Sequence, residues 1–320
     1  MKELLAGTGK EIAGQSGSAA PLGGPFMASS SFYDQIDANK RNSYLLMFTV
    51  FALVFAAVYA FSYLFLDAGP LGFGIGAILS AAYIFLAYSY ADKVVLSLSG
   101  AREAQKGEFP YLVNVVEGLS IAAGIPTPKI YVIDEQGLNA FATGTSPQKA
   151  SVAFTTGLLR AMNRSELEGV AAHEISHIKN LDSRMSTLVV VMVGLIAILS
   201  DMGLRSMFWG RRGGGDRDRG GGLLMLVGLL IIILAPIVAQ LVRLALSRQR
   251  EYLADASGAQ LTRYPPGLAS ALEKIKDKGS VVARATETTA PLYFAVPVSM
   301  GSLFSTHPPI EDRIKKLKGM

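Results

Sequence analysis

Two histidines and a glutamate near the middle of the chain have the spacing of a metal site. The segment reads His173-Glu-Ile-Ser-His177, and on a helix the residues at positions i and i+4 lie on the same face. Both imidazoles can therefore bind one zinc ion, while Glu174 can act as a base toward water at the metal. The pattern predicts hydrolysis with one Zn2+ per chain. A surface helix that carries these side chains by chance is the alternative.

A zinc protease site needs a third protein ligand, and the composition limits the choice. The chain has no cysteine, and its third histidine, His307, lies far from the first two. A carboxylate must then complete the site. In Arg250-Glu-Tyr-Leu-Ala-Asp255, Glu251 and Asp255 share one helical face, so Glu251 can bind the metal while Asp255 accepts the free N–H of a zinc-bound histidine. A solvated acidic face is the alternative for this pair.

The composition indicates a membrane protein. Of the 320 residues, 50% are hydrophobic and 17% are charged, whereas ordinary soluble domains carry about 25% charged residues. Uncharged runs at 44–66 and 71–90 are each long enough to cross a bilayer and predict a transmembrane hairpin. Two further hydrophobic runs, 185–203 and 223–242, enclose an Arg/Gly-rich loop. Either that loop crosses the membrane despite its arginines, or this second hairpin does not fully span.

The segments between these runs predict a mainly α-helical α+β protein with four hydrophobic helices and a cytoplasmic domain that contains a small β-sheet. The His173–His177 motif makes this domain a candidate zincin-like protease domain. Strands are expected at 129–133 and 151–155, and a helix at 110–123. The expected order is a flexible N-terminal tail (1–40), the transmembrane hairpin (41–91), the first part of the protease domain (92–184), the second hydrophobic hairpin (185–245) and the second part of the protease domain (246–320).

The helix that carries the two histidines is expected to begin at Ser165, because Glu168 stands three residues later and can complete a capping box. No stop signal follows within the next turns. The helix is therefore expected to continue directly into the third hydrophobic run.

Charge sets the expected orientation and partners. The net charge of +5 is a mild excess that suits a bilayer with anionic lipid heads and argues against nucleic acid as a partner. Lys40, Arg41 and Lys93 flank the first hairpin at its open end, whereas the short loop at its tip has no basic residue. The positive-inside rule then predicts a multi-pass protein of the cell membrane whose active site faces the cytoplasm.

Longer motifs accompany the metal residues. They are Tyr33 to Asn39 before the first hydrophobic run, Asn139 to Gly144, the continuation of the first zinc segment to Asp182, and Phe304 to Pro309 followed by Arg313. With these motifs the chain resembles, over about residues 33–320, the HtpX branch of membrane-bound zinc endopeptidases of the gluzincin type.

This resemblance implies a role for each matching residue. Zinc is assigned to His173, His177 and Glu251, with Glu174 as the catalytic base. By the same resemblance, Asp182 and Asp255 support the ligands, and Asn139, Ala140, Phe141 and Ala142 form an exposed edge strand along which a peptide substrate lies. His307 and Arg313 match positions that face the cleft, where they could donate hydrogen bonds to the developing oxyanion or to a substrate carbonyl. As an alternative, His307 caps a helix that begins at Pro308.

The function implied is hydrolysis of misfolded or unfolded membrane-protein substrates, as quality control during heat or envelope stress. A CAAX-type prenyl endopeptidase is the nearest enzymatic alternative, although four hydrophobic runs are few for that branch. A non-catalytic membrane scaffold stabilised by zinc is the alternative from another class. Glu174 argues against the scaffold, because a purely structural zinc site has no use for a base.

Overall fold

The computed structural model describes residues 32–65, 69–105, 107–192, 194, 247–286, 289–296 and 308–320. Residues 1–31 of the expected tail, most of the second hydrophobic hairpin with its Arg/Gly-rich loop, and His307 lie outside the described residues.

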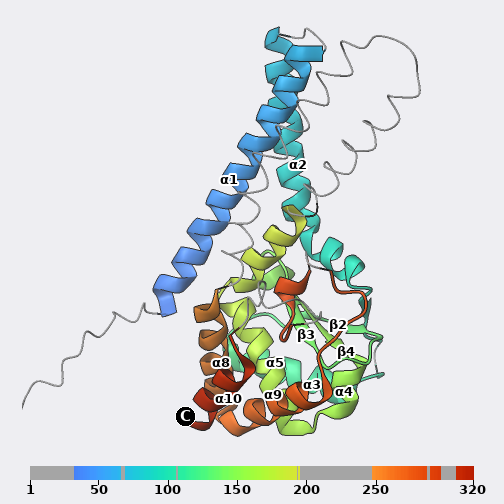
Figure 1. Ribbon diagram of the computed structural model, residues 1–320, viewed down its shortest axis with the longest axis vertical. Helices are drawn as coiled ribbons and strands as arrows, with labels where there is room; N and C mark the ends of the chain where they lie inside the picture. The colour runs from blue at the N-terminus through green and yellow to red at the C-terminus, as the bar shows by residue number, and fades with distance from the viewer. Residues whose placement is uncertain are drawn as a thin grey trace, which may run out of the picture.

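Two long helices, α1 (Phe32–Phe65) and α2 (Gly69–Leu98), run side by side as a stalk above the rest of the molecule (Figure 1). They lie where the first two hydrophobic runs are. Helix α1 begins at Phe32, so its first residues lie within the segment 1–40 that was expected to be a flexible tail. Asn39 and Ser43 in this first part of α1 are buried, with 5% and 0% of their surface exposed. Contacts with the protease domain thus order a polar segment whose composition predicted a flexible tail.

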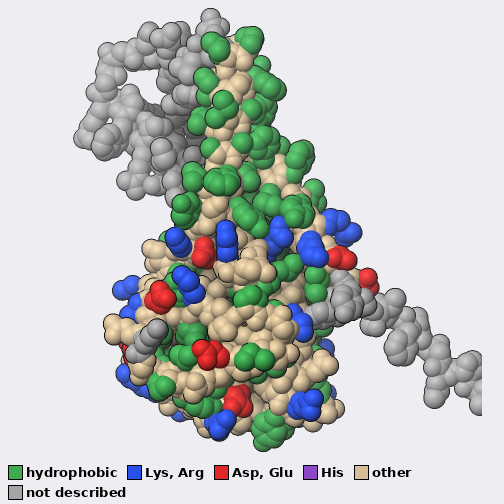
Figure 2. Space-filling model, turned by 180° about the vertical axis from the view of Figure 1, so that it is seen from behind, with side chains coloured by type: hydrophobic (Ala, Val, Ile, Leu, Met, Phe, Trp, Pro, Cys, Tyr) green, Lys and Arg blue, Asp and Glu red, His purple; other side chains and the backbone are tan. Residues whose placement is uncertain are grey.

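Large apolar side chains cover the outside of the stalk, as Figure 2 shows. Phe48 is 69% exposed, and Leu71, Ile78 and Phe85 are each at least 70% exposed. Among the described residues, one helix, α2, is both long and apolar enough by composition to cross a membrane. Lysines and arginines lie at the base of the stalk, where it meets the protease domain (Figure 2).

A small mixed sheet lies in the protease domain and has the strand order β1-β2-β4-β3. The expected strands are found as β2 (Lys129–Ile133) and β4 (Ser151–Thr155), which pair in parallel with Ile130 opposite Val152. The short β1 (Arg102–Glu103) pairs antiparallel with β2. At the other end of the order, β3 (Ala140–Thr143) pairs antiparallel with β4 and places Phe141 opposite Ala153.

Helices make up most of the protease domain, in agreement with a mainly α-helical α+β fold. Val152 and Phe154 of the sheet pack against Val170 and Ile175 of the central helix α5, with Leu272 completing this core. The helices are α3 (Pro110–Ala123), α4 (Thr156–Ala161), α5 (Arg164–Lys179), α8 (Arg248–Thr262), α9 (Pro265–Lys278) and α10 (Ile310–Lys318), with short 3-10 turns at Pro147–Lys149 and Ala290–Leu292.

The start of α5 differs from the expectation. Asn163, not Ser165, is the N-cap, and it forms a capping box with Glu166. Glu168 instead pairs with Arg164 on the exposed face, at 2.9 Å. Two overlapping cap patterns are present in this segment, and the one that forms is the one whose glutamate is buried against α9, where Lys274 Nζ lies 2.6 Å from its carboxylate.

The end of α5 differs as well, since the helix does not run on into the third hydrophobic run. It ends at Lys179, and Leu181 adopts a left-handed conformation with φ +60° before a new helical segment at 182–192. That conformation costs a residue with a side chain about 1–2 kcal/mol and is usually marked by a glycine. The sequence has no glycine at this position and therefore does not indicate the turn. The turn is therefore decided by tertiary contacts.

Two glycines allow neighbouring helices to approach α5 closely. A Cβ atom on Gly258 of α8 would lie 3.0 Å from the backbone nitrogen of His173, and one on Gly169 of α5 would lie 2.7 Å from the backbone nitrogen of Leu268 in α9. Any larger residue at either position would push the helices apart. The first close approach is what brings α8 and its carboxylates to the two histidines.

Candidate metal centre and active site

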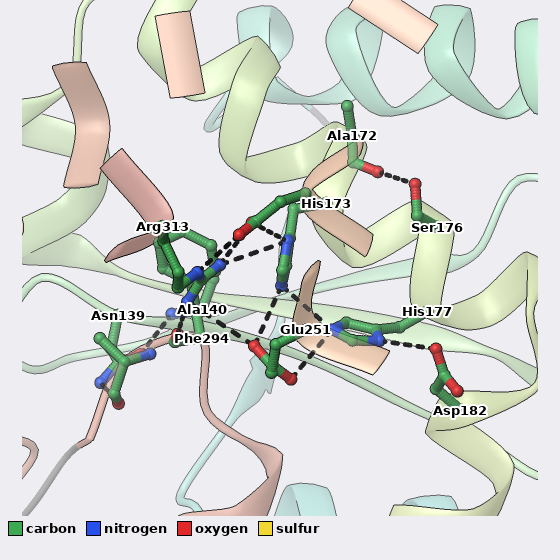
Figure 3. Close-up of polar contacts among 12 residues, drawn as sticks. Asn139, Ala140, Ala172, His173, Ser176, His177, Asp182, Glu251, Phe294 and Arg313 are labelled. Carbon is green, nitrogen blue, oxygen red and sulfur yellow. Dashed lines mark hydrogen bonds and ion pairs between the residues drawn. The ribbon is translucent and has the colours of Figure 1, made fainter. Parts of the chain in front are cut away.

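Three side chains from α5 and α8 converge at one point (Figure 3). His173 and His177 lie one turn apart on α5, with their Nε2 atoms 3.0 Å from each other. Glu251, in the first turn of α8, lies 3.7 Å from His173 Nε2 and 3.6 Å from His177 Nε2. Two nitrogens bound to one tetrahedral zinc at the usual bond length lie about 3.3 Å apart, so these separations suit a single ion.

Each histidine has a carboxylate on its other ring nitrogen. His173 Nδ1 lies 2.9 Å from Asp255, which stands one turn after Glu251 on α8. His177 Nδ1 lies 3.1 Å from Asp182, beyond the turn that ends α5. Both aspartates are almost fully buried. These contacts hold each ring with Nε2 directed at the shared point, which is the usual arrangement around metal-binding histidines.

The charges at this point fit a cation. Burial lowers the pKa of His173 to about 4, whereas Asp182 and Glu251 outweigh burial and raise the pKa of His177 to about 9. Nearby carboxylates thus favour positive charge at His177, whose Nε2 lies 3.0 Å from that of His173. A divalent ion bound at this point would supply positive charge there, and the donor set of two imidazoles and one carboxylate is one that zinc accepts.

Glu174 is adjacent to this point and is almost completely buried, with 1% of its surface exposed. Its Oε1 atom has no hydrogen-bond partner among the described residues. Burial is the main reason why the pKa of Glu174 is raised to about 8, and the charge of Glu251 adds to it. A carboxylate in this state binds a proton readily at neutral pH and can release it again, which a general acid and base requires.

Arg313 on α10 lies behind the histidines rather than facing an open cleft. Its Nε and Nη2 atoms donate to the two oxygens of Asp255 at 2.8 and 2.7 Å, and Nη1 donates to the backbone oxygen of Phe294 at 3.0 Å. The guanidinium is 2% exposed and also lies over the Phe294 ring. These contacts do not support the expected donation to an oxyanion, because most of the donors are already used inside the protein.

The Asn139–Ala142 segment forms the edge strand, but its edge is not exposed as expected. All of β3 is buried. The Phe294 N–H donates to Ala140 O at 2.8 Å, and Phe141 forms a bridge with Tyr293. Asn139 reinforces this cover, since its side chain both accepts from Ala295 N–H and donates to Ala295 O. Residues 293–295, called the edge cover below, therefore pair with the outside of β3.

Sequence reasoning missed two contributors to the site. Phe294 packs edge-on against His173 with ring centroids 4.8 Å apart, and nothing in its local sequence marks it. Asn39 on α1 donates to Asp182 at 2.7 Å, although the motif that contains it could have drawn attention to this segment. His307 lies outside the described residues.

Comparison with known proteins agrees with this geometry. Residues 106–320 match the model of Peptidase family M48. A protein named Protease HtpX homolog from Dictyoglomus thermophilum is 53% identical over 292 residues, which cover 91% of this chain and 95% of the relative. The chain belongs to peptidase family M48. It is an HtpX homolog, and thus a membrane-associated metalloendopeptidase of a zinc-dependent family.

Other matches extend the comparison. The Protease HtpX homolog of Caldanaerobacter subterraneus subsp. tengcongensis is 45% identical over 298 residues, covering 92% of this M48 peptidase and 99% of the relative. Among solved structures, the crystal structure of S. mikatae Ste24p superposes with a TM-score of 0.46 and 20% identity, and the match covers 88% of this chain and 66% of that chain, just under two thirds of its length.

Proposed function

We propose that this M48 peptidase binds one zinc ion through His173, His177 and Glu251 and hydrolyses peptide bonds with Glu174 as the proton carrier. The observation that carries the proposal is the convergence of the two Nε2 atoms and the Glu251 carboxylate, which offer ligand atoms within 4.8 Å of one another beside a buried carboxyl group. A zinc ion held there would supply the Lewis acid that makes a water molecule acidic enough to attack at neutral pH.

The remaining steps belong to residues of the chain. Glu174 takes a proton from the attacking water and later gives it to the leaving amine, for which its place beside the two histidines and Glu251 is suited. Asp255 and Asp182 hold the two imidazoles in their tautomers during the reaction. Arg313 keeps Asp255 ionised and in place, because it donates to both of its oxygens. In this proposal Arg313 positions a ligand and does not touch the substrate.

The substrate class follows from the surroundings of the site. The apolar side chains exposed on α1 and α2 require lipid around the stalk. Lysines and arginines gather at its base (Figure 2), and Lys40, Arg41 and Lys93 flank the hydrophobic runs in the sequence, which favours the cytoplasmic side. A catalytic centre directly below such a stalk is within reach of unfolded loops and ends of membrane proteins. We therefore propose misfolded membrane proteins at the cytoplasmic face of the cell membrane as substrates, in a quality-control role under stress.

The substrate main chain is proposed to pair with the outer edge of β3, in extended conformation. The edge cover occupies this position, since Phe294 already donates to Ala140 O. Pairing of a substrate along Ala140 therefore requires that residues 293–295 leave the strand. The two buried aromatic side chains of the cover, Tyr293 and Phe294, make the covered state the resting one.

The test compares the wild type with Glu174→Gln and His173→Ala in detergent-purified, zinc-loaded protein, using an unfolded membrane protein and a prenylated CAAX peptide as substrates. We expect Glu174→Gln to bind one zinc per chain and to lose at least about a hundredfold in cleavage rate, since it keeps the shape but loses the base. His173→Ala should lose zinc. Full activity of Glu174→Gln would refute the mechanism, and faster cleavage of the prenylated peptide than of the unfolded protein would refute the substrate class.

A further inference from the structure

Asn39 is a buried polar residue on the stalk, and its amide nitrogen reaches the turn beside the metal centre. Nδ2 donates to Asn180 O at 2.9 Å and to Asp182 Oδ1 at 2.7 Å. The other oxygen of Asp182 lies 3.1 Å from His177 Nδ1. A continuous line of contacts therefore leads from helix α1 to one of the metal-binding histidines.

The turn explains why Asp182 needs to be held. On a continuous helix, residues five apart point about 140° away from each other, so Asp182 would face away from His177. The left-handed conformation of Leu181 interrupts the helix and directs Asp182 back toward the ring. An unfavourable conformation persists only where surrounding contacts determine it. The bond from Asn39 to the carbonyl of Asn180, the residue just before Leu181, is such a contact.

Apolar packing fastens α1 to the same region. Leu46 and Val50 of α1 are buried against Met185 and Leu188, which belong to the helical segment that follows the turn. Ser43, one turn after Asn39 on α1, also lies against this segment, with its Oγ 3.9 Å from Met185 Sδ. The stalk thus touches both sides of Asp182, and a change in the position of α1 is passed on to the turn.

We propose that Asn39 is a positioning residue that couples the stalk helix α1 to the metal ligand His177 through Asp182. This inference rests on the proposed function, because it takes His177 as a zinc ligand. Without the Asn39 amide, Asp182 can turn toward Arg250, whose Nε lies 4.0 Å from its Oδ1. His177 then loses the carboxylate that sets its tautomer and ring orientation.

The expected size of the effect follows from the distance to the metal. Loss of the partner that directly orients a metal-binding histidine costs about 10–100-fold in metal affinity. Asn39 is one contact further out and leaves Asp182 in place, so Asn39→Ala should weaken zinc binding by about tenfold, at the lower end of this range. If Asn39 acts only through Asp182, its replacement should cost nothing more once Asp182 has been removed.

The experiment measures zinc affinity of the full chain in detergent by competition with a chromophoric chelator. The variants are Asn39→Ala, Asp182→Ala and the double variant. Asn42→Ala, three residues further along α1, is the matched control. Asn42 is half-buried, and within the described part of the chain no hydrogen bond of its side chain is found. We expect about tenfold weaker binding for Asn39→Ala, a change under twofold for Asn42→Ala, and no added loss in the double variant.

Unchanged affinity in Asn39→Ala would overturn the proposal, and so would the same tenfold loss in the Asp182→Ala background. Should Asn39→Ala also lower the unfolding temperature of the zinc-free protein, the double variant decides. A loss of zinc affinity caused only by weakened folding would add to the loss of Asp182→Ala, whereas a loss that acts through Asp182 would not. The proposed function fails by a different result, namely wild type that binds no zinc or His173→Ala that binds it normally.

Discussion

Arg313→Met compared with Lys318→Met tests whether burial, rather than distance, decides the strength of the ion pairs that hold α10. Arg313 lies 2.7 Å from Asp255 and Lys318 lies 2.6 Å from Glu273, so the two pairs are equally close. Their exposure differs, because the side chains of the first pair are 2% and 3% exposed and those of the second are 61% and 44% exposed. Methionine replaces the apolar stem in both variants, so little packing volume is lost.

The magnitudes follow from what each substitution leaves behind. Arg313→Met leaves Asp255 ionised and buried without its cation, which costs about 3–5 kcal/mol. Lys318→Met removes a screened surface pair that is worth about 0–1 kcal/mol. For a domain of this size, each 1 kcal/mol lowers the midpoint by about 2–4 °C, so we expect a loss of about 6–20 °C against less than about 4 °C.

The assay is thermal unfolding of the zinc-free protein in detergent, followed by circular dichroism at one scan rate for all variants. Chelator is present throughout, so that differences in zinc binding do not contribute. Arg313→Lys serves as an intermediate, because one ammonium nitrogen keeps the charge but cannot reproduce contacts that three separate nitrogens of the guanidinium make with Asp255 and the Phe294 carbonyl. Equal losses in Arg313→Met and Lys318→Met, or a loss below about 1 kcal/mol in Arg313→Met, would refute the reasoning.

Two further outcomes are expected. Lys274→Met should destabilise the protein by about 1–2 kcal/mol at pH 7, because it removes a charged hydrogen bond to the buried Glu166, discounted for the partial exposure of the lysine. Burial raises the pKa of Glu166, but hydrogen bonds, that from Lys274 foremost, lower it overall. The ionised Glu166 therefore contributes its full stabilisation above the unfolded pKa of 4.5, and this stabilisation is lost as the pH falls through the folded pKa. Unfolding midpoints of wild type and variant should therefore converge between pH 7 and pH 3, and a constant gap would contradict the assignment. A disulfide between Phe141→Cys and Tyr293→Cys, in a chain that has no other cysteine, should fasten the edge cover to β3 and suppress cleavage of an unfolded substrate until it is reduced. Equal rates in the oxidised and reduced forms would mean that the substrate lies elsewhere.

Local features of the fold could be predicted from the sequence with good success. The strands at 129–133 and 151–155 are found within the expected limits, because a short run of β-branched residues between turns has few alternatives. The helix at 110–123 is found too, with Pro110 at its start and Gly124 in the left-handed conformation at its end. The predicted start and the predicted end of α5 were both wrong, and the reason is the same. The two overlapping N-cap patterns, at Asn163 and at Ser165, differ little in local free energy, and so do a turn at Leu181 and a continued helix. Burial against other elements outweighs these small differences.

The candidate metal-binding residues could be predicted from the sequence, because each pair lies on a single helix. The i, i+4 spacing of His173 and His177, and that of Glu251 and Asp255, follow from helix geometry alone. With no cysteine in the chain, the choice of the third ligand was narrow. What lies around these ligands was decided by packing between elements far apart in the chain. Asn39 reaches Asp182 across 143 positions, and Arg313 reaches His173 across 140. The periodicity of hydrophobic residues along the chain does not indicate such pairs. Each pair depends on how closely two helices approach and on which side chains are buried between them.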